Sequence, residues 1–288
     1  MTAAPDPESF LSGETGHVAG VRRTVWRTIG DRTLDLRARL SGAEQQLDEL
    51  AEEAPEREVV VLSVYRSSTT CLPDALEELR RSHQRLRLLL GSMGEPLPEL
   101  AANTCAGGLD GGKFQNLNAV WEAAAPGPFD WLLVIDDDVT LPHRFLDRFV
   151  ALCERFDLAL AQPAQTLMSH AAWRVTRRRG GSYLRETRFV EIGPVTAFRS
   201  DAAAELLPFP DLRYGWGLDL HWAALAAERG WRLGIVDALA VRHETSPVAG
   251  AYRHQDAIEE AQRFLTGRKF LHSDRAQETL AIHKTLTR

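Results

Sequence analysis

The stretch Trp131-Leu-Leu-Val-Ile-Asp-Asp-Asp-Val139 runs five apolar residues directly into three consecutive aspartates. A short apolar run of this kind predicts a strand that is buried on both faces. Neighbouring carboxylates repel one another, and a carboxylate beside a core is costly unless a cation compensates its charge. Oxygen ligands favour Mg²⁺ or Mn²⁺, so the stretch predicts a divalent metal site, with a solvated acidic turn as the alternative.

The directions of the three aspartate side chains separate their roles. In an extended strand Asp136 and Asp138 point to one side, and Asp137 points to the other. We therefore expect Asp138 to be a direct metal ligand, Asp136 a ligand or a ribose contact, and Asp137 a structural residue. Open α/β sheets bind ligands at the carboxyl ends of their strands, which places the predicted site at that edge.

The composition is that of an ordinary soluble globular protein. The chain has 288 residues, of which 44% are hydrophobic and 26% charged. Its net charge of −6 argues against nonspecific nucleic-acid binding. Three widely spaced cysteines (Cys71, Cys105 and Cys153) form no disulfide framework, so a cytoplasmic location is expected. No apolar run approaches the roughly 20 residues of a transmembrane helix, although peripheral contact with a membrane is left open.

Strands and helices alternate over the first half of the chain. Apolar runs predict strands at 59–65, 86–90, 131–135 and 158–161. Helices are expected over about 73–84, 113–124 and 142–154. This alternation predicts an α/β fold with a mainly parallel central sheet flanked by helices.

The rest of the chain has a different pattern. Residues 172–198 alternate apolar and polar side chains around Gly180-Gly181, which predicts a hairpin. A helix at 218–229, short strands at 232–236 and 238–241, and one or two helices from 254 follow. An amphipathic helix is expected over 31–53.

The sequence predicts that the chain divides into three segments. They are an N-terminal extension over 1–57, a domain over 58–245 that divides after 164, and a helical tail over 246–288. The terminal helices can pair two copies of the chain, so a homodimer is one expectation.

Gly107-Gly-Leu-Asp-Gly-Gly-Lys-Phe114 nearly spells a phosphate-binding P-loop. Phe114 stands where that motif needs a hydroxyl for Mg²⁺, and the loop does not follow the first strand. A Gly-rich turn into a helix can still receive an anion through backbone N–H groups. Lys113, Asn116 and Asn118 are therefore candidate nucleotide-binding residues; a surface lysine and capping amides are the alternative.

Six arginines crowd the segment from Arg174 to Arg188. They predict either recognition of a phosphate by guanidinium groups or a solvated hairpin with basic edges. Most of them fit the solvated hairpin. Arg188 is the exception because it adjoins a predicted strand at 189–192, and we take Arg188 and Glu191 as candidate catalytic residues.

Two further motifs offer chemistry. In Tyr214-Gly-Trp-Gly-Leu-Asp-Leu-His-Trp222, Trp216 presents a flat surface for a sugar ring, and Asp219 is a candidate base on the first turn of a helix. Asp219 can instead simply stabilise the helix N-terminus. His243 ends an apolar strand and is a candidate third metal ligand, although a lone histidine is more often structural.

Taken together, these motifs resemble the GT-A fold of metal-dependent nucleotide-sugar glycosyltransferases. Residues 59–65 are similar to the first nucleotide-binding strand, Asp136-Asp-Asp138 to the DxD motif, and His243 to the C-terminal metal-binding histidine. Asp219 is similar to the acid on the acceptor side. The 113–118 and 214–219 motifs resemble a bacterial branch of glycosyltransferase-like proteins. The similarity covers about residues 58–245.

The resemblance implies an enzyme that cleaves a UDP- or GDP-linked sugar with Mn²⁺ or Mg²⁺ and transfers the sugar to a hydroxyl acceptor. Residues 58–164 would hold the nucleotide and the metal, and residues 165–245 would hold the sugar and the acceptor. Within the first half, Arg66 and the 107–118 loop would bind the nucleotide. Leu218 replaces the glutamate of the family's common Glu-Asp pair, which leaves the base assignment open. The family also includes pyranose–furanose mutases with an Asp-Asp-Asp motif, so a mutase is the second hypothesis. A non-catalytic nucleotide-sugar binding protein is the third.

Overall fold

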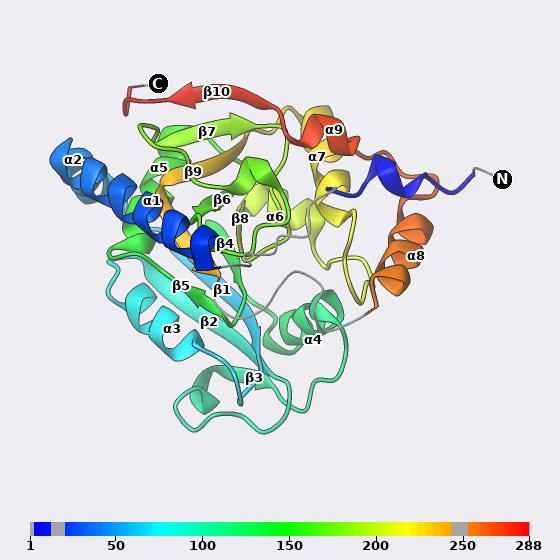
Figure 1. Ribbon diagram of the computed structural model, residues 1–288. Coiled ribbons are helices and arrows are strands. Elements are labelled where there is room, and N and C mark those ends of the chain that lie inside the picture. Colours follow the sequence, from blue (N-terminus) through cyan, green and yellow to red (C-terminus); the bar gives the residue numbers. More distant parts are fainter. Residues whose placement is uncertain (1–2, 13–20, 244–252, 288) are drawn as a thin grey trace.

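One sheet crosses the molecule and separates two apolar cores (Figure 1). The computed structural model describes residues 3–12, 21–243 and 253–287. Alternate residues of the central strands serve the two cores, since Val60 and Leu62 pack on one side and Val59 and Val61 on the other. The period of two along a strand explains why this run is apolar throughout.

The sheet contains both parallel and antiparallel pairs. Its strands are β1 Glu58–Tyr65, β2 Arg85–Ser92, β3 Thr104–Ala106, β4 Trp131–Ile135, β5 Val139–Thr140, β6 Leu160–Gln165, β7 Leu184–Thr187, β8 Val195–Arg199, β9 Leu233–His243 and β10 Thr279–His283. The order is β10-β7-β9-β6-β8-β4-β1-β2-β3, and β5 pairs with β9. Strands β3, β2, β1 and β4 are parallel, β8 is antiparallel to both β4 and β6, and β6 is parallel to β9.

Helices cover both faces of the sheet. They are α1 Val21–Leu40, α2 Ala43–Glu53, α3 Leu72–Arg80, α4 Lys113–Ala124, α5 Phe145–Arg155, α6 Ser200–Leu206, α7 Leu218–Arg229, α8 His254–Leu265 and α9 Ser273–Ala276. Short 3-10 turns lie at Pro7–Ser9, Ala101–Asn103 and Arg174–Thr176. Apolar side chains of α2, α3 and α5 fill one core, and those of α4, α6, α7 and α8 fill the other. The predicted α/β fold with helices on both sides is confirmed.

The predicted hairpin over 172–198 is wrong. β7 pairs with β9 and β10, whereas β8 lies between β4 and β6, so the two strands are not neighbours. A buried ion pair holds β7 on β9, because Arg185 donates two hydrogen bonds to Asp237, each of 2.8 Å. The strand predicted at 189–192 is also absent, and that segment is a loop between β7 and β8.

Three smaller predictions change. The helix expected over 31–53 begins earlier and is broken into α1 and α2 at Gly42, whose φ of 73° ends a continuous helix. The two strands predicted at 232–236 and 238–241 are one strand, β9. The tail contains the expected helices, α8 and α9, and also β10, which extends the sheet through β7. The predicted boundary at 245 lies outside the described residues.

Candidate functional site

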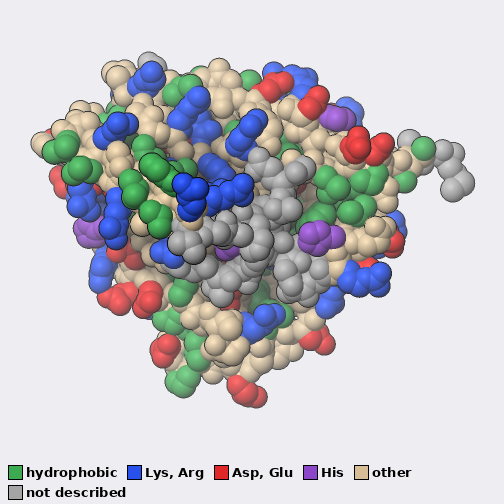
Figure 2. Space-filling model, viewed as in Figure 1, with side chains coloured by type: hydrophobic (Ala, Val, Ile, Leu, Met, Phe, Trp, Pro, Cys, Tyr) green, Lys and Arg blue, Asp and Glu red, His purple; other side chains and the backbone are tan. Residues whose placement is uncertain are grey.

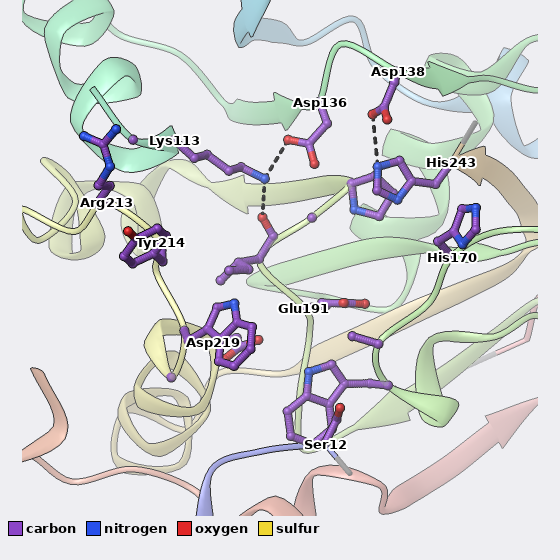
Figure 3. A pocket seen from close by; sticks show the side chains of 18 of the residues that line it. Ser12, Lys113, Asp136, Asp138, His170, Glu191, Arg213, Tyr214, Asp219 and His243 are labelled. Carbon is purple, nitrogen blue, oxygen red and sulfur yellow. Dashed lines mark hydrogen bonds and ion pairs between the residues drawn. The ribbon is translucent and has the colours of Figure 1, made fainter. Parts of the chain in front are cut away.

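A cavity of about 750 Å³ opens where β1 and β4 end, and residues from both halves of the chain line it (Figure 3). Most of the residues selected from the sequence meet here. They are Arg66, Lys113, Asn116, Asp136, Asp138, Glu191, Trp216, Asp219 and His243. The parallel order of β1 and β4 explains why the end of each strand contributes to one site.

At one end of the cavity, Asp136 is paired with a lysine. The Nζ of Lys113 lies 2.6 Å from Asp136 Oδ1 and donates to the Ile192 carbonyl at 2.9 Å. Lys113 is the first residue of α4, so the Gly-rich turn before it aims the ammonium at the end of β4. Gly193 closes on this pair, since a Cβ there would lie 2.8 Å from both Asp136 Oδ2 and Lys113 Nζ. A side chain at this position would therefore displace Asp136 or Lys113 from its observed place.

Asp138 and His243 form the second charged pair. His243 Nε2 lies 3.0 Å from Asp138 Oδ1, and the antiparallel pairing of β5 with β9 brings the two together. Burial alone would lower the pKa of His243, but its hydrogen bond to Asp138 and the charges of Asp138 and Asp136 raise it above the ordinary value. The protonated imidazole is therefore stabilised by both acids that flank Asp137.

Asp137 points away from these pairs and ties loops together. Its Oδ2 accepts the backbone N–H of Arg66 at 2.8 Å, and its carbonyl accepts the N–H of Cys71 at 2.9 Å. Burial raises the pKa of Asp137 to about 6, against the lowering effect of the Arg66 hydrogen bond. This aspartate fixes the β1 end beside the β4 end.

The donors at this edge fit a divalent cation in kind. Two carboxylates and an imidazole are ligands of Mn²⁺ and related ions, and Asp138 with His243 already presents two donors 3.0 Å apart. Asp136 turns to Lys113 instead. Consequently, no group of three His, Cys, Asp or Glu side chains among the described residues is arranged as a ready metal site.

Two buried carboxyl groups, Glu191 and Asp219, lie deeper in the cavity (Figure 3). Burial raises the pKa of Asp219 to about 7, although backbone N–H groups of Leu220 and Ile192 lower it. Burial and then the charge of Asp219 raise the pKa of Glu191 to about 8. Gln165 Nε2 donates to Glu191 Oε2 at 2.9 Å, and Leu220 N–H donates to Asp219 Oδ1 at 2.9 Å. Near neutral pH the pair can therefore hold and release a proton.

Asn118 and Arg188 do not line the cavity. Asn118 clamps the backbone of Phe209, donating to its carbonyl at 2.7 Å and accepting its N–H at 2.9 Å. Arg188 pairs with Glu278, just before β10. Each of these side chains binds a residue far along the chain. Its position beside a motif in the sequence does not reveal that partner. Arg178 is likewise paired with Asp31 and Asp35 of α1.

Several lining residues were not selected from the sequence. They include Phe10, Leu11, Ser12, Gln165, His170, Trp173, Arg213 and Tyr214. Arg213 and Tyr214 directly precede the Gly-Trp-Gly motif, which could have indicated them. The backbone of Arg213 packs on Gly112 so closely that a Cβ there would lie 2.0 Å from its carbonyl oxygen. Phe10 gave no local signal, because a single aromatic in a Pro-punctuated segment does not report what it packs against.

No family model matches the chain, and no curated protein matches it by sequence. Solved structures do match. S. aureus TarS (residues 1–349) in complex with UDP-GlcNAc aligns with a TM-score of 0.50 at 12% identity, over 73% of this chain and 65% of that one. The chain has the GT-A fold.

GalNAc-T7, crystallised with UDP, GalNAc and Mn²⁺, aligns over 66% of this chain and 44% of that chain, with a TM-score of 0.49 and 11% identity. The chain thus spans less than two thirds of the length of either solved protein. At 12% identity the likeness to TarS establishes the GT-A fold alone.

Proposed function

We propose that the chain is a metal-dependent glycosyltransferase that moves a sugar from a UDP- or GDP-linked donor to an acceptor hydroxyl. One observation carries this proposal. A single cavity holds paired acids and a histidine at the strand edge and, beyond them, a buried carboxyl with a pKa near neutrality. The first set suits a diphosphate with its cation, and the second suits proton transfer.

The strand edge is the donor end. Asp136, Asp138 and His243 would hold the metal, which, when bound, neutralises the charge of a departing diphosphate. Lys113, Arg66 and Arg213 line the same cavity and add positive charge for the phosphates. Because Lys113 is already beside Asp136, it stands where an ammonium can exchange a carboxylate partner for a phosphate oxygen.

The deeper end supplies the proton chemistry. Asp219 would accept the proton of the acceptor hydroxyl, and the N–H of Leu220 holds one of its oxygens in place. Glu191, with the higher pKa, would be protonated at neutral pH and donate a hydrogen bond to the sugar. Trp216 lines the cavity three residues before Asp219 and meets His254 edge-on at 5.7 Å between ring centroids, so we assign it to stacking on a sugar ring.

Incubation with UDP- and GDP-sugars, Mn²⁺ and a panel of hydroxyl acceptors tests the proposal. We expect nucleoside diphosphate release that accelerates with the right acceptor and disappears on chelation of the metal. The Asp147→Asn variant is a matched control. Asp147 is as buried as Asp219 but accepts hydrogen bonds from Ser82 and His83, outside the cavity.

Two other outcomes would select the alternatives. An isomeric nucleotide sugar formed without acceptor would indicate the mutase, in which the sugar returns to its own diphosphate through another ring oxygen. Tight Mn²⁺-dependent nucleotide binding with no turnover across the donor panel would indicate a binding protein. Either result would exclude transfer of the sugar to an acceptor. The assignment of Asp136, Asp138 and His243 to the metal and the diphosphate would remain.

A further inference from the structure

Helix α1 carries an exposed apolar face on the side that points away from the protein. With about 100° per residue, the exposed apolar side chains fall within one arc of about 100°. They are Val25, Trp26, Ile29, Leu36 and Leu40, and the exposed fractions of Trp26 and Leu40 are 71% and 78%. Thr33 lies inside the arc, and its hydroxyl is bonded to the Ile29 carbonyl at 2.7 Å. We call this set of side chains the outer face of α1.

The opposite side of α1 anchors the helix to the protein. Asp31 accepts the backbone N–H groups of Leu167 and Met168 at 3.0 and 3.1 Å and pairs with Arg178. Leu34 packs on Gly180, where a Cβ would lie 2.5 Å from its Cδ2. The residues on the inner side of α1 thus hold the helix on the protein. The apolar residues of the outer face form no part of this contact, so their apolar character needs a separate explanation.

Arginines surround the outer face. Arg32 and Arg39 lie on one edge and Arg37 on the other, with Arg22 at the N-terminal end of the arc. All four are exposed, and within the described part of the chain Arg22, Arg32 and Arg37 form no ion pair. The helix carries six arginines and two aspartates, a net charge of +4, whereas the whole chain carries −6. Figure 2 shows basic and apolar side chains together on the side of the molecule where Figure 1 places α1.

This charge distribution selects an anionic partner. In a symmetric dimer the outer face would pack on itself and bring arginines against arginines, with no acid on the face to pair them. Asp31 and Asp35 are engaged by Arg178 on the inner side. An apolar face with a tryptophan and a rim of arginines matches a helix that lies in the interface of an anionic membrane.

We propose that α1 docks the protein on the surface of an anionic membrane. Among the described residues there is no helix with the length and apolar character to cross a bilayer, so the contact would be peripheral. The helix is about 30 Å long, and its five apolar side chains would enter the boundary between headgroups and acyl chains. Leu167 and Met168, which Asp31 holds, lie between Gln165 and His170 of the cavity wall. A bilayer bound at the outer face would therefore be separated from the site by α1 and this loop.

Vesicle flotation with the full chain tests this proposal. We expect binding to phosphatidylcholine vesicles that contain phosphatidylglycerol, and a bound fraction at least about tenfold lower with phosphatidylcholine alone. The double variants W26S/I29S and R32E/R37E should each lose most of the binding, for the apolar and the electrostatic reason respectively. Leu280→Ser is the matched control, since Leu280 is an exposed apolar residue of β10 with 55% exposure.

Thermal unfolding of each variant would verify that it folds as the parent does. Equal flotation of the parent and both double variants would overturn the proposal, as would absence of binding to either vesicle. A dimer in light scattering without lipid that W26S/I29S dissociates would also overturn it and restore the homodimer. Sugar transfer plays no part in these measurements, so they stand apart from the proposed function.

Discussion

The two ends of the cavity treat their acids in opposite ways. At the strand edge, Asp136 and Asp138 each have a cationic or protonatable partner, and their side chains are 26% and 15% exposed. At the deep end, Asp219 and Glu191 are buried, and the pKa of each is raised mainly by desolvation. The surroundings of the first pair therefore suit the exchange of one ionic partner for another, whereas those of the second pair suit the binding and release of protons near neutral pH.

The largest effect should come from removing the proton acceptor at the deep end. Asp219→Asn should lower kcat by about 10³-fold, because general-base catalysis contributes about 10²–10⁴-fold. Nucleotide binding should persist, since the strand edge is unchanged. Steady-state kinetics and calorimetry check both parts against Asp147→Asn. Unchanged turnover in Asp219→Asn would show that Asp219 is not the proton acceptor, and the proposed difference in role between the two ends would be wrong.

The next largest effect should fall on the strand edge. Asp138→Ala and His243→Ala should each weaken Mn²⁺-dependent binding of a nucleoside diphosphate by about 100-fold, or about 2.7 kcal/mol, because each removes one metal donor. Calorimetric titration with and without Mn²⁺ measures the loss. His221→Ala is the control, because His221 binds the Lys269 carbonyl outside the cavity. Equal metal dependence in all three variants would refute the donor set.

The pH dependence of transfer should follow the deep end. With a pKa of about 7, Asp219 loses its proton as pH rises, so the base form accumulates above neutrality. We expect kcat/KM to rise about sixfold between pH 6 and pH 7.5 and then to fall as Glu191, whose pKa is about 8, loses its proton. Rates measured across this range, with Asp147→Asn for comparison, locate the midpoint. A rate that is flat or falls between pH 6 and pH 7 would exclude Asp219 as the base.

The smallest effect should be on stability. The folded pKa of Asp219 is raised from 3.8 to about 7, so the folded state binds its proton more tightly than the unfolded state. The contribution of this group to stability is thus lost as pH rises from about 4 to 7. Asp219→Asn should gain about 1–3 kcal/mol above pH 7 and almost nothing below pH 4. Melting temperatures at several pH values test this, and a gain at low pH only would contradict it.

Much of the site could be predicted because its signals are local. The apolar run before Asp136–Asp138 predicts the end of a strand, and the Gly-Trp-Gly-Leu-Asp219 segment predicts the start of a helix. In the GT-A fold such ends lie together at one edge of the sheet. Arg188 and Asn118 show the limit of that reasoning. Each is a polar residue near a motif, and each is committed to a contact with a residue about 90 positions away, which no local pattern reports.

By itself, the sequence determined the alternation of strands and helices, the acid-tipped β4 and the fold class, because burial repeats with the period of each element. Only the tertiary structure decided that Asp136 meets Lys113, that Glu191 and Asp219 share a desolvated pocket, and that β7 and β8 pair with other strands. Partners and desolvation depend on residues far along the chain. The three aspartates are adjacent in sequence, yet their different surroundings give each a different role.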